Sequence, residues 1–324
     1  MLKHVKALAL GLVVVTAATA ASAQDKLTYL FPAPDFLPAF SPFQIAKAKG
    51  YYKAEGLDVE FQVGKGGADV AKQVAVGNAD MGGGIGDTPL IVRANGLPVK
   101  GVALLGGKSL TALYVRKEVG VKTLADLKGK KIGVLAFQDT TYYNLVAMLA
   151  SAGLKKDDAD IQAVGPAGIV QLMIAKNLDA ISGVPEWAAA IEGAQIGLDR
   201  YAIDAVFPAM AQAILASDKA IAEKPKAVQG FVRATLKGIA DIMANPEQAS
   251  KDYVAAVPQH AGKEKVMEAI MRRYVEQVYA PAEGFKLGQF DKARMEKVQK
   301  FYVDNQIVEK AVPIDETFTN QFVQ

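Results

Sequence analysis

The residue types that perform most enzyme chemistry are scarce in this 324-residue chain, which has no cysteine and two histidines, His4 and His260. Without cysteine there can be no disulfide, no thiolate metal site and no cysteine nucleophile. A catalytic triad or a zinc site would depend on His260 alone once His4 is removed with a leader segment. The sequence therefore predicts a binding protein that is not an enzyme and that carries no metal or cofactor.

Side chains suited to ligand binding gather in five short segments, each of which follows an apolar run. These segments carry four acids and four aromatic rings, namely Asp35, Asp87, Asp139, Glu186, Phe36, Phe40, Phe137 and Trp187. They also supply Lys65, Gly66, Gly67, Thr88 and Thr140. Carboxylates repel anions and accept hydrogen bonds from ring N–H or amino groups. Because aromatic walls favour a flat ring, we expect a small planar nitrogen-containing solute.

A second interpretation of the same segments favours an anion. Predicted helix N-termini at Gly67, Thr88 and Thr141 would direct amide N–H groups at the ligand, and Lys65 and Lys108 could assist. An anion such as a sulfonate is therefore the alternative solute.

Three of the candidate residues also have a purely structural interpretation. Asp87 and Asp139 each lie beside a predicted helix start, where capping is a common role for aspartate. Trp187 would pack at the start of another helix. On the ligand interpretation, replacing Asp35 or Trp187 by alanine weakens binding with little loss of stability.

The elements that must position these segments follow from alternating patterns in the first two thirds of the chain. Apolar runs such as Leu27–Phe31 and Lys131–Val134 predict strands, and stretches such as Ala68–Val76 predict helices. This alternation predicts an α/β fold built from βαβ units, with parallel sheets covered on both faces. Ligands then meet the loops beyond the carboxyl ends of the strands.

The pattern restarts after an offset of 99 residues, which indicates two similar lobes. Five residues of the first copy match the second: Gly66, Ala68, Asn78, Asp80 and Gly84 fall on Gly165, Ala167, Asn177, Asp179 and Gly183. After about Gln212 helix follows helix, and we expect these helices to cover the first lobe. The predicted lobes are 24–112 with 213–324, and 113–212. Leu110–Arg116 and Ala211–Ser217 are the predicted crossing segments of a clam-shell that closes on its ligand.

The first 23 residues have the three parts of a secretory signal. Lys3 and Lys6 precede an apolar run, and Ala21-Ser22-Ala23 supplies small residues at a cleavage site. The run is about 14 residues long, against the roughly 20 that span a bilayer. We expect cleavage after Ala23 and export to the periplasm. The net charge of +3 is too small to indicate nucleic-acid binding.

Four strings resemble a known family. The segment from Ala46 to Glu60 is AKAKGYYKAEGLDVE, and that from Thr123 to Val134 is TLADLKGKKIGV. GNADM at Gly77 and KNLDA at Lys176 form two similar helix-to-strand turns. They resemble exported solute-binding proteins of the nitrate/sulfonate/taurine and thiamine-pyrimidine group.

This resemblance implies a type II periplasmic-binding fold and a monomer that delivers a small-molecule solute to an ABC permease in the inner membrane. A ligand-sensing receptor domain is the alternative class. Related proteins that make thiamine pyrimidine use a Cys-rich motif and histidine. Since this chain has no cysteine, the resemblance favours binding over synthesis.

Overall fold

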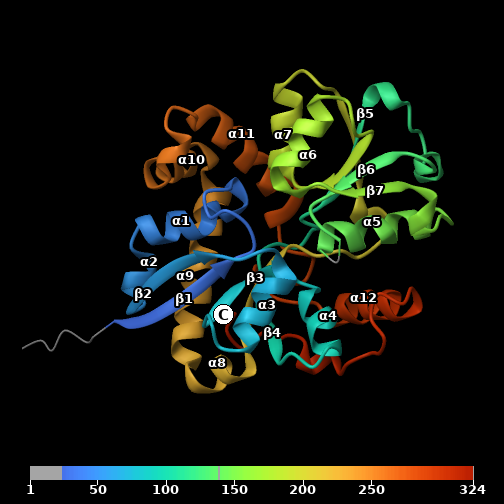
Figure 1. Ribbon diagram of the computed structural model, residues 1–324. Coiled ribbons are helices and arrows are strands. Elements are labelled where there is room, and N and C mark those ends of the chain that lie inside the picture. Colours follow the sequence, from blue (N-terminus) through green and yellow to red (C-terminus); the bar gives the residue numbers. More distant parts are fainter. Residues whose placement is uncertain (1–23, 138, 324) are drawn as a thin grey trace, which may run out of the picture.

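The computed structural model describes residues 24–137 and 139–323, which form two five-stranded sheets flanked by helices (Figure 1). The predicted signal segment lies outside the described residues. In spatial order, the first sheet contains β2 (Leu57–Val63), β1 (Asp25–Phe31), β3 (Met81–Ile85), β10 (Gln212–Ser217) and β4 (Val99–Leu104). The second contains β7 (Asp160–Ala163), β6 (Lys131–Val134), β8 (Ala180–Gly183), β5 (Ala112–Arg116) and β9 (Leu198–Ala202).

Helices connect the strands within each sheet. In the first they are α1 (Ser41–Ala48), α2 (Tyr51–Ala54), α3 (Gly67–Ala75) and α4 (Thr88–Ala94). In the second they are α5 (Thr140–Ser151), α6 (Gly165–Ile174) and α7 (Pro185–Gly193). These bounds confirm the predicted α/β alternation. The sequence prediction missed β5 and β9.

The two sheets have the same strand order, which supports the predicted repeat. Four strands of each sheet correspond in chain order: β1 to β6, β2 to β7, β3 to β8 and β4 to β9. The strand delivered by a crossing, β10 in the first sheet and β5 in the second, takes the same fourth place in both. Gly66 and Gly165 occupy equivalent positions before α3 and at the start of α6, and both have positive φ, +93° and +68°. Such values favour glycine, which explains why the residue recurs in both copies.

The expectation of purely parallel sheets is wrong. β10 runs antiparallel to β3 and β4, and β5 runs antiparallel to β8 and β9. The cause is an exchange: each crossing of the chain between the sheets delivers a strand that runs against its neighbours. The predicted crossing segments Leu110–Arg116 and Ala211–Ser217 largely coincide with these two strands. The crossings themselves are residues 105–111 and 203–211, and the amide of Leu110 donates to the carbonyl of Met210 (3.1 Å).

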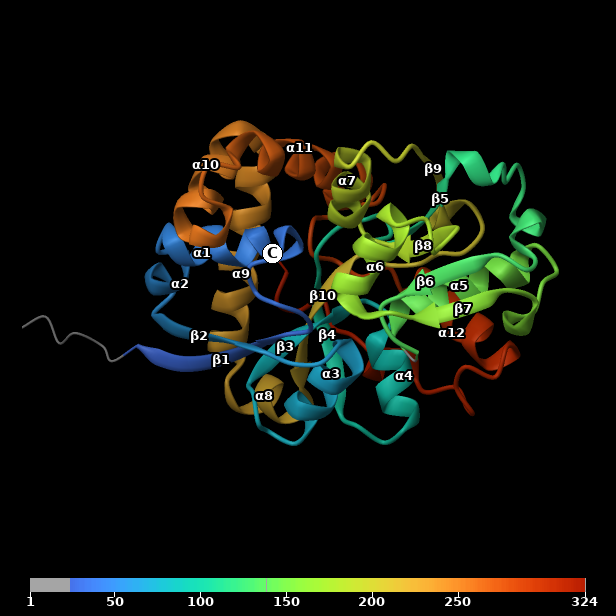
Figure 2. The same ribbon diagram turned by 45° about the horizontal axis from the view of Figure 1, so that its top comes forward.

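The last third of the chain is mostly helical, as predicted, and contains α8 (Asp218–Glu223), α9 (Pro225–Ala244), α10 (Pro246–Ala256), α11 (Glu264–Tyr274) and α12 (Lys292–Asp304). α9 packs against α1 and α2, and α10 packs against α1. α11 reaches α7 of the second sheet (Figures 1 and 2). The helical segment therefore contacts both sheets, whereas the sequence assigned it to the first lobe. No helix among the described residues is long and apolar enough to cross a membrane.

An aromatic cluster fixes the carboxyl end of β1. The ring of Tyr29 stacks on Phe231 with centroids 4.9 Å apart, and Phe31 contacts Phe40 at 4.6 Å. Burial of such rings contributes strongly to a core and leaves little freedom of orientation. The loop 32–40 that follows β1 therefore leaves the sheet from a rigid base.

Candidate ligand-binding cleft

A hollow lies between the two sheets, where loops from both converge. We call it the inner chamber, and it encloses about 610 Å³ counted to its mouth. Its walls are Pro32, Ala33, Leu37, Ala39, Phe40, Gly67, Gly84, Ile85, Leu110, Thr111, Leu135, Asp139, Thr140, Thr141, Val184, Glu186, Trp187 and Gln212.

Each wall of the inner chamber comes from a strand end or a helix start. The loop after β1 ends in the 3₁₀ turn Pro38–Phe40, which presents Ala39 and Phe40. The first turns of α5 and α7 present Thr140 and Trp187. The first crossing segment adds Leu110. Because these ends face one another across the gap, ligand contacts from both sheets would be made together.

Close approach at Gly84 depends on the absence of a side chain. A Cβ at this position would lie 2.8 Å from Leu215 and 2.9 Å from Thr88 Oγ1. The strand end β3 can therefore form a wall of the chamber only with glycine here.

A second hollow, the outer chamber, adjoins the inner one. It measures about 820 Å³ and is lined by Pro34, Lys65, Gly66, Ala136, Phe137 and Pro166 among others. The two chambers share Pro32, Ala33, Gly67, Leu135 and Asp139. Phe137 is 57% exposed here and lies edge-on to Tyr142 at 5.6 Å. The outer chamber is thus the more polar and open part of one cleft.

Glu186 is a buried carboxyl in the wall of the inner chamber. It accepts a hydrogen bond from the hydroxyl of Tyr274. Burial raises the pKa of Glu186 to about 7, while the bond from Tyr274 acts to lower it. Near neutral pH this group can either accept or donate a hydrogen bond.

Asp139 both caps a helix and lines the cleft, the two roles that the sequence left open for it. Its Oδ1 accepts from the amide of Thr141 (2.9 Å) at the start of α5, so it caps the helix. It also lines both chambers. Burial raises the pKa of Asp139, and the hydrogen bonds from Thr141 lower it.

Cations are missing from the inner chamber. Within the part of the chain that the structure describes, no lysine or arginine lines it, and its polar side chains are Thr111, Asp139, Thr140, Thr141, Glu186 and Gln212. Two carboxyls without a paired cation disfavour a bound anion and favour a neutral or cationic hydrogen-bond donor. The remaining walls are apolar and include the aromatic residues Phe40 and Trp187.

Most of the residues predicted for the site lie along this cleft. The inner chamber brings together Phe40, Gly67, Asp139, Thr140, Glu186 and Trp187. The outer chamber brings in Lys65, Gly66 and Phe137. Lys108 lies elsewhere, with its Nζ donating to the carbonyl of Glu276 (2.8 Å).

Asp35 and Phe36 do not line either chamber. Gln44 donates to the backbone carbonyl of Asp35 (3.1 Å), which turns the loop toward α1. Phe36 lies against the ring of His260, and its carbonyl is 2.6 Å from His260 Nε2. His260 therefore contacts the loop that follows β1.

Asp87 and Thr88 also lie outside the lining. Asp87 is fully buried behind the chamber, where it accepts from the hydroxyl of Tyr302 (2.7 Å) and makes no cap bond to α4. Burial raises the pKa of Asp87 to about 6, and the bond from Tyr302 lowers it. Thr88 Oγ1 accepts from the amide of Ile85 (3.0 Å) and so closes the turn that precedes α4.

Sequence reasoning missed the lining residues from the crossings and from the apolar loops. Leu110 and Thr111 belong to the first crossing, and Gln212 begins β10 directly after the second. The prediction of two crossing segments near these positions was the available signal, since crossings between two lobes must pass the floor of the cleft. Apolar residues such as Leu37 and Val184 gave no signal of their own.

Comparison with known proteins places this geometry in a family. The model of the NMT1/THI5-like family matches residues 37–249. The riboflavin-binding protein RibY of Chloroflexus aurantiacus is 28% identical over 319 residues, covering 95% of this chain and 90% of the relative. The 4-amino-5-hydroxymethyl-2-methylpyrimidine phosphate synthase THI5 of Saccharomyces cerevisiae is 26% identical over 252 residues, 72% of each chain.

Solved structures share the fold. The alkanesulfonate-binding protein SsuA from Xanthomonas axonopodis pv. citri, solved bound to MOPS, superposes with a TM-score of 0.70 at 18% identity. The match covers 92% of this chain and 98% of that one. It confirms the predicted type II periplasmic-binding fold. The relatives include proteins named for binding and others named as synthases.

Proposed function

The chain belongs to the NMT1/THI5-like family, and from this premise we propose that it captures a flat, nitrogen-containing ring compound in its central cleft and delivers it to an ABC importer. One observation carries the choice of ligand class. The inner chamber combines the buried carboxyl of Glu186, the half-buried carboxyl of Asp139 and aromatic walls with no lysine or arginine among its described lining residues.

The chemistry of the walls favours ring N–H or amino donors. Asp139 and Glu186 would accept hydrogen bonds from such donors, and Trp187 and Phe40 would contact the ring faces. A sulfonate or nitrate would meet two carboxyls with no counter-charge in the inner chamber, which costs binding energy. The names of the relatives agree with a ring compound, since one binds riboflavin and another makes a pyrimidine phosphate.

Binding without catalysis is part of the proposal. The chain has no cysteine to supply the Cys-rich motif of the pyrimidine-making relatives. His260, the histidine within the described residues, contacts the backbone of Phe36 and does not line the inner chamber. The cleft therefore lacks the groups for that synthesis and retains those for recognition.

Export and transport complete the proposal. We propose that residues 1–23 direct the chain to the periplasm and that the two sheets with their helices act as lobes, 24–112 with 213–324 and 113–212, which close on the solute. The closed form then docks on an inner-membrane permease as a monomer.

The chain has a built-in reporter for a test, because its single tryptophan, Trp187, lines the inner chamber. Residues 24–324 would be titrated with riboflavin, 4-amino-5-hydroxymethyl-2-methylpyrimidine, taurine, an alkyl sulfonate and nitrate while tryptophan fluorescence and the melting temperature are recorded. We expect at least one ring compound to change the fluorescence and raise the melting temperature. A response to taurine, the sulfonate or nitrate alone would overturn the ligand class.

A further inference from the structure

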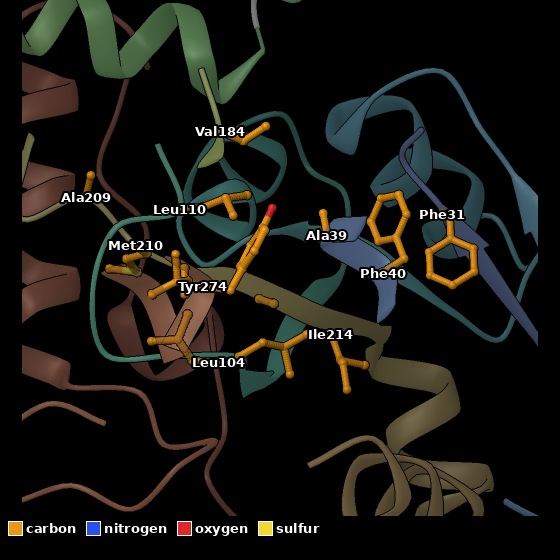
Figure 3. Close-up of a cluster of buried hydrophobic side chains, with 14 of the residues drawn as sticks. Phe31, Ala39, Phe40, Leu104, Leu110, Val184, Ala209, Met210, Ile214 and Tyr274 are labelled. Carbon is orange, nitrogen blue, oxygen red and sulfur yellow. The ribbon is translucent and has the colours of Figure 1, made fainter. Parts of the chain in front are cut away.

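Tyr274 is a buried phenol, on a helix far along the chain, that contacts the cleft-wall residue Glu186. Tyr274 is the last residue of α11 and is 2% exposed. Figure 3 shows its ring near Leu110, with the hydroxyl directed toward the space between Leu110, Val184 and Ala39. All three of these residues line the inner chamber. The hydroxyl donates to Oε2 of Glu186 at the start of α7.

A second contact, next to the Tyr274 bond, also joins α11 to α7. The guanidinium of Arg273 pairs with the carboxylate of Glu192 at 2.6 Å. On its other side α11 packs against α10 and against the 3₁₀ turn Pro38–Phe40. Two consecutive residues of α11 therefore anchor α7, while the helix body contacts the wall formed after β1.

We propose that Tyr274 is a positioning residue, which fixes the Glu186 carboxylate as the hydrogen-bond acceptor for the bound ring compound. The phenol occupies one carboxylate oxygen, and the lone pairs that remain can accept from the ligand. The match to the family model ends at residue 249, so α11 lies beyond the matched segment. The role as acceptor for a ligand rests on the proposed function; the effect of Tyr274 on the protonation of Glu186 does not.

Tyr274 is the strongest of the hydrogen-bond donors that lower the pKa of Glu186, ahead of the backbone amides of Glu186 and Ala39. Neutral phenols face this carboxyl from three further elements: Tyr114 of β5, Tyr253 of α10 and Tyr279 of the π-helical turn Val275–Tyr279. The nearby cation, Arg273, is paired with Glu192, and Asp139 shares the same chamber. Burial raises the pKa of Glu186, and the Tyr274 hydroxyl opposes that rise. Loss of this hydroxyl would therefore leave the carboxyl protonated at neutral pH.

The first test needs no ligand. The pKa of Glu186 would be measured by NMR of ¹³C-labelled glutamate carboxyls, with the Glu186 signal assigned by its loss in Glu186→Gln. In Tyr274→Phe we expect that pKa to rise by about one pH unit or more, because a hydrogen bond to a charged group is lost. Tyr52→Phe is the matched control, since Tyr52 is also a buried phenol and bonds Thr235 (2.9 Å) away from the cleft. An unchanged Glu186 pKa in Tyr274→Phe overturns the proposal.

The second test measures riboflavin affinity between pH 6 and 9 by Trp187 fluorescence. A rise of one pH unit from about 7 reduces the ionised fraction of Glu186 at pH 7 from about one half to about one tenth. We expect Tyr274→Phe to bind riboflavin about fivefold more weakly at pH 7 and nearly normally at pH 9. A deficit that is the same at every pH assigns Tyr274 to packing alone and overturns its positioning role. Failure of the wild-type protein to bind any ring compound overturns the proposed function, while the NMR measurement still decides the role of Tyr274.

Discussion

Arg294 of α12 joins both segments on which the chain crosses between the sheets. Its guanidinium donates to the carbonyl of Gly107 in the first crossing and to those of Pro208 (3.1 Å) and Ala209 in the second. It also pairs with Asp204 at 3.2 Å, and that carboxylate in turn accepts from a backbone amide of the first crossing. One side chain therefore fixes the separation of the two connections about which any lobe movement must occur.

The energetic consequence of removing this side chain can be worked out from its burial. The Arg294 side chain is 13% exposed, so Arg294→Met leaves Asp204 and three carbonyls without their partner. Asp204 is 34% exposed and keeps its bond from the backbone amide of the first crossing, so losing this pair costs less than the roughly 3–5 kcal/mol of a fully buried pair. Each carbonyl left without its donor adds about 1 kcal/mol. We expect unfolding free energy to fall by about 3 kcal/mol, since the groove beside Arg294 admits water. At about 2 °C per kcal/mol for a chain of this size, the melting temperature falls by about 6 °C.

Urea unfolding followed by circular dichroism measures this loss. Arg272→Met is the matched control, because Arg272 lies on the exposed face of α11 and pairs with Glu268 one turn away. That surface pair contributes less than about 1 kcal/mol. A loss below about 1 kcal/mol in Arg294→Met, equal to the control, would refute the assignment of Arg294 as the link between the crossings.

Three further predictions concern the cleft and the core. Burial raises the pKa of Glu186 from 4.5 to about 7, so the folded state binds more protons between these values and loses stability as pH rises through them. Between pH 5 and pH 8, urea unfolding should show wild type losing about 2.5 kcal/mol more stability than Glu186→Gln, and equal losses would contradict the shifted pKa. Gly238→Ala should destabilise the protein by about 1–3 kcal/mol, because its Cβ would lie 2.3 Å from a backbone oxygen of α1. Gly193→Ala is the control: its Cβ meets nothing within 4 Å, so thermal melts should show it to be neutral or stabilising. Calorimetry should show that Trp187→Ala weakens riboflavin binding about tenfold or more, whereas Asp35→Ala leaves the affinity unchanged because Asp35 does not line the chamber. A larger loss of affinity in Asp35→Ala than in Trp187→Ala would refute the placement of the site.

The α/β alternation and the repeat could be predicted because they depend on local patterns. The turn at Gly66 and its counterpart at Gly165 require positive φ wherever they occur, so the glycines mark them in the sequence. The antiparallel direction of β5 and β10 could not be predicted, because the strands that pair with them depend on where each crossing delivers the chain. Val115, for example, pairs with Ala180 on one side and Asp199 on the other, both distant in sequence.

The different contacts of the two aspartates at helix starts show why site residues are harder to predict than helices and strands. Asp87 and Asp139 occupy the same position relative to α4 and α5. Asp139 caps its helix because nothing closer competes for its carboxylate, and the same orientation leaves it in the chamber wall. Asp87 gives up the capping role because Tyr302 of α12 donates to it from across the core. A contact 215 residues away along the chain therefore decides which aspartate faces the cleft.

The same reasoning extends to the role of the C-terminal helices. Two buried carboxyls at or behind the inner chamber receive a phenol from these helices: Glu186 from Tyr274 and Asp87 from Tyr302. Asp139 is satisfied by Thr141 within its own turn. A segment that the sequence marks only as a helical cover thus supplies the donors that fix two of the three carboxyls. Because each donor opposes the effect of burial on the pKa of its carboxyl, changes in α11 or α12 should alter ligand recognition without touching a residue of the β–α loops.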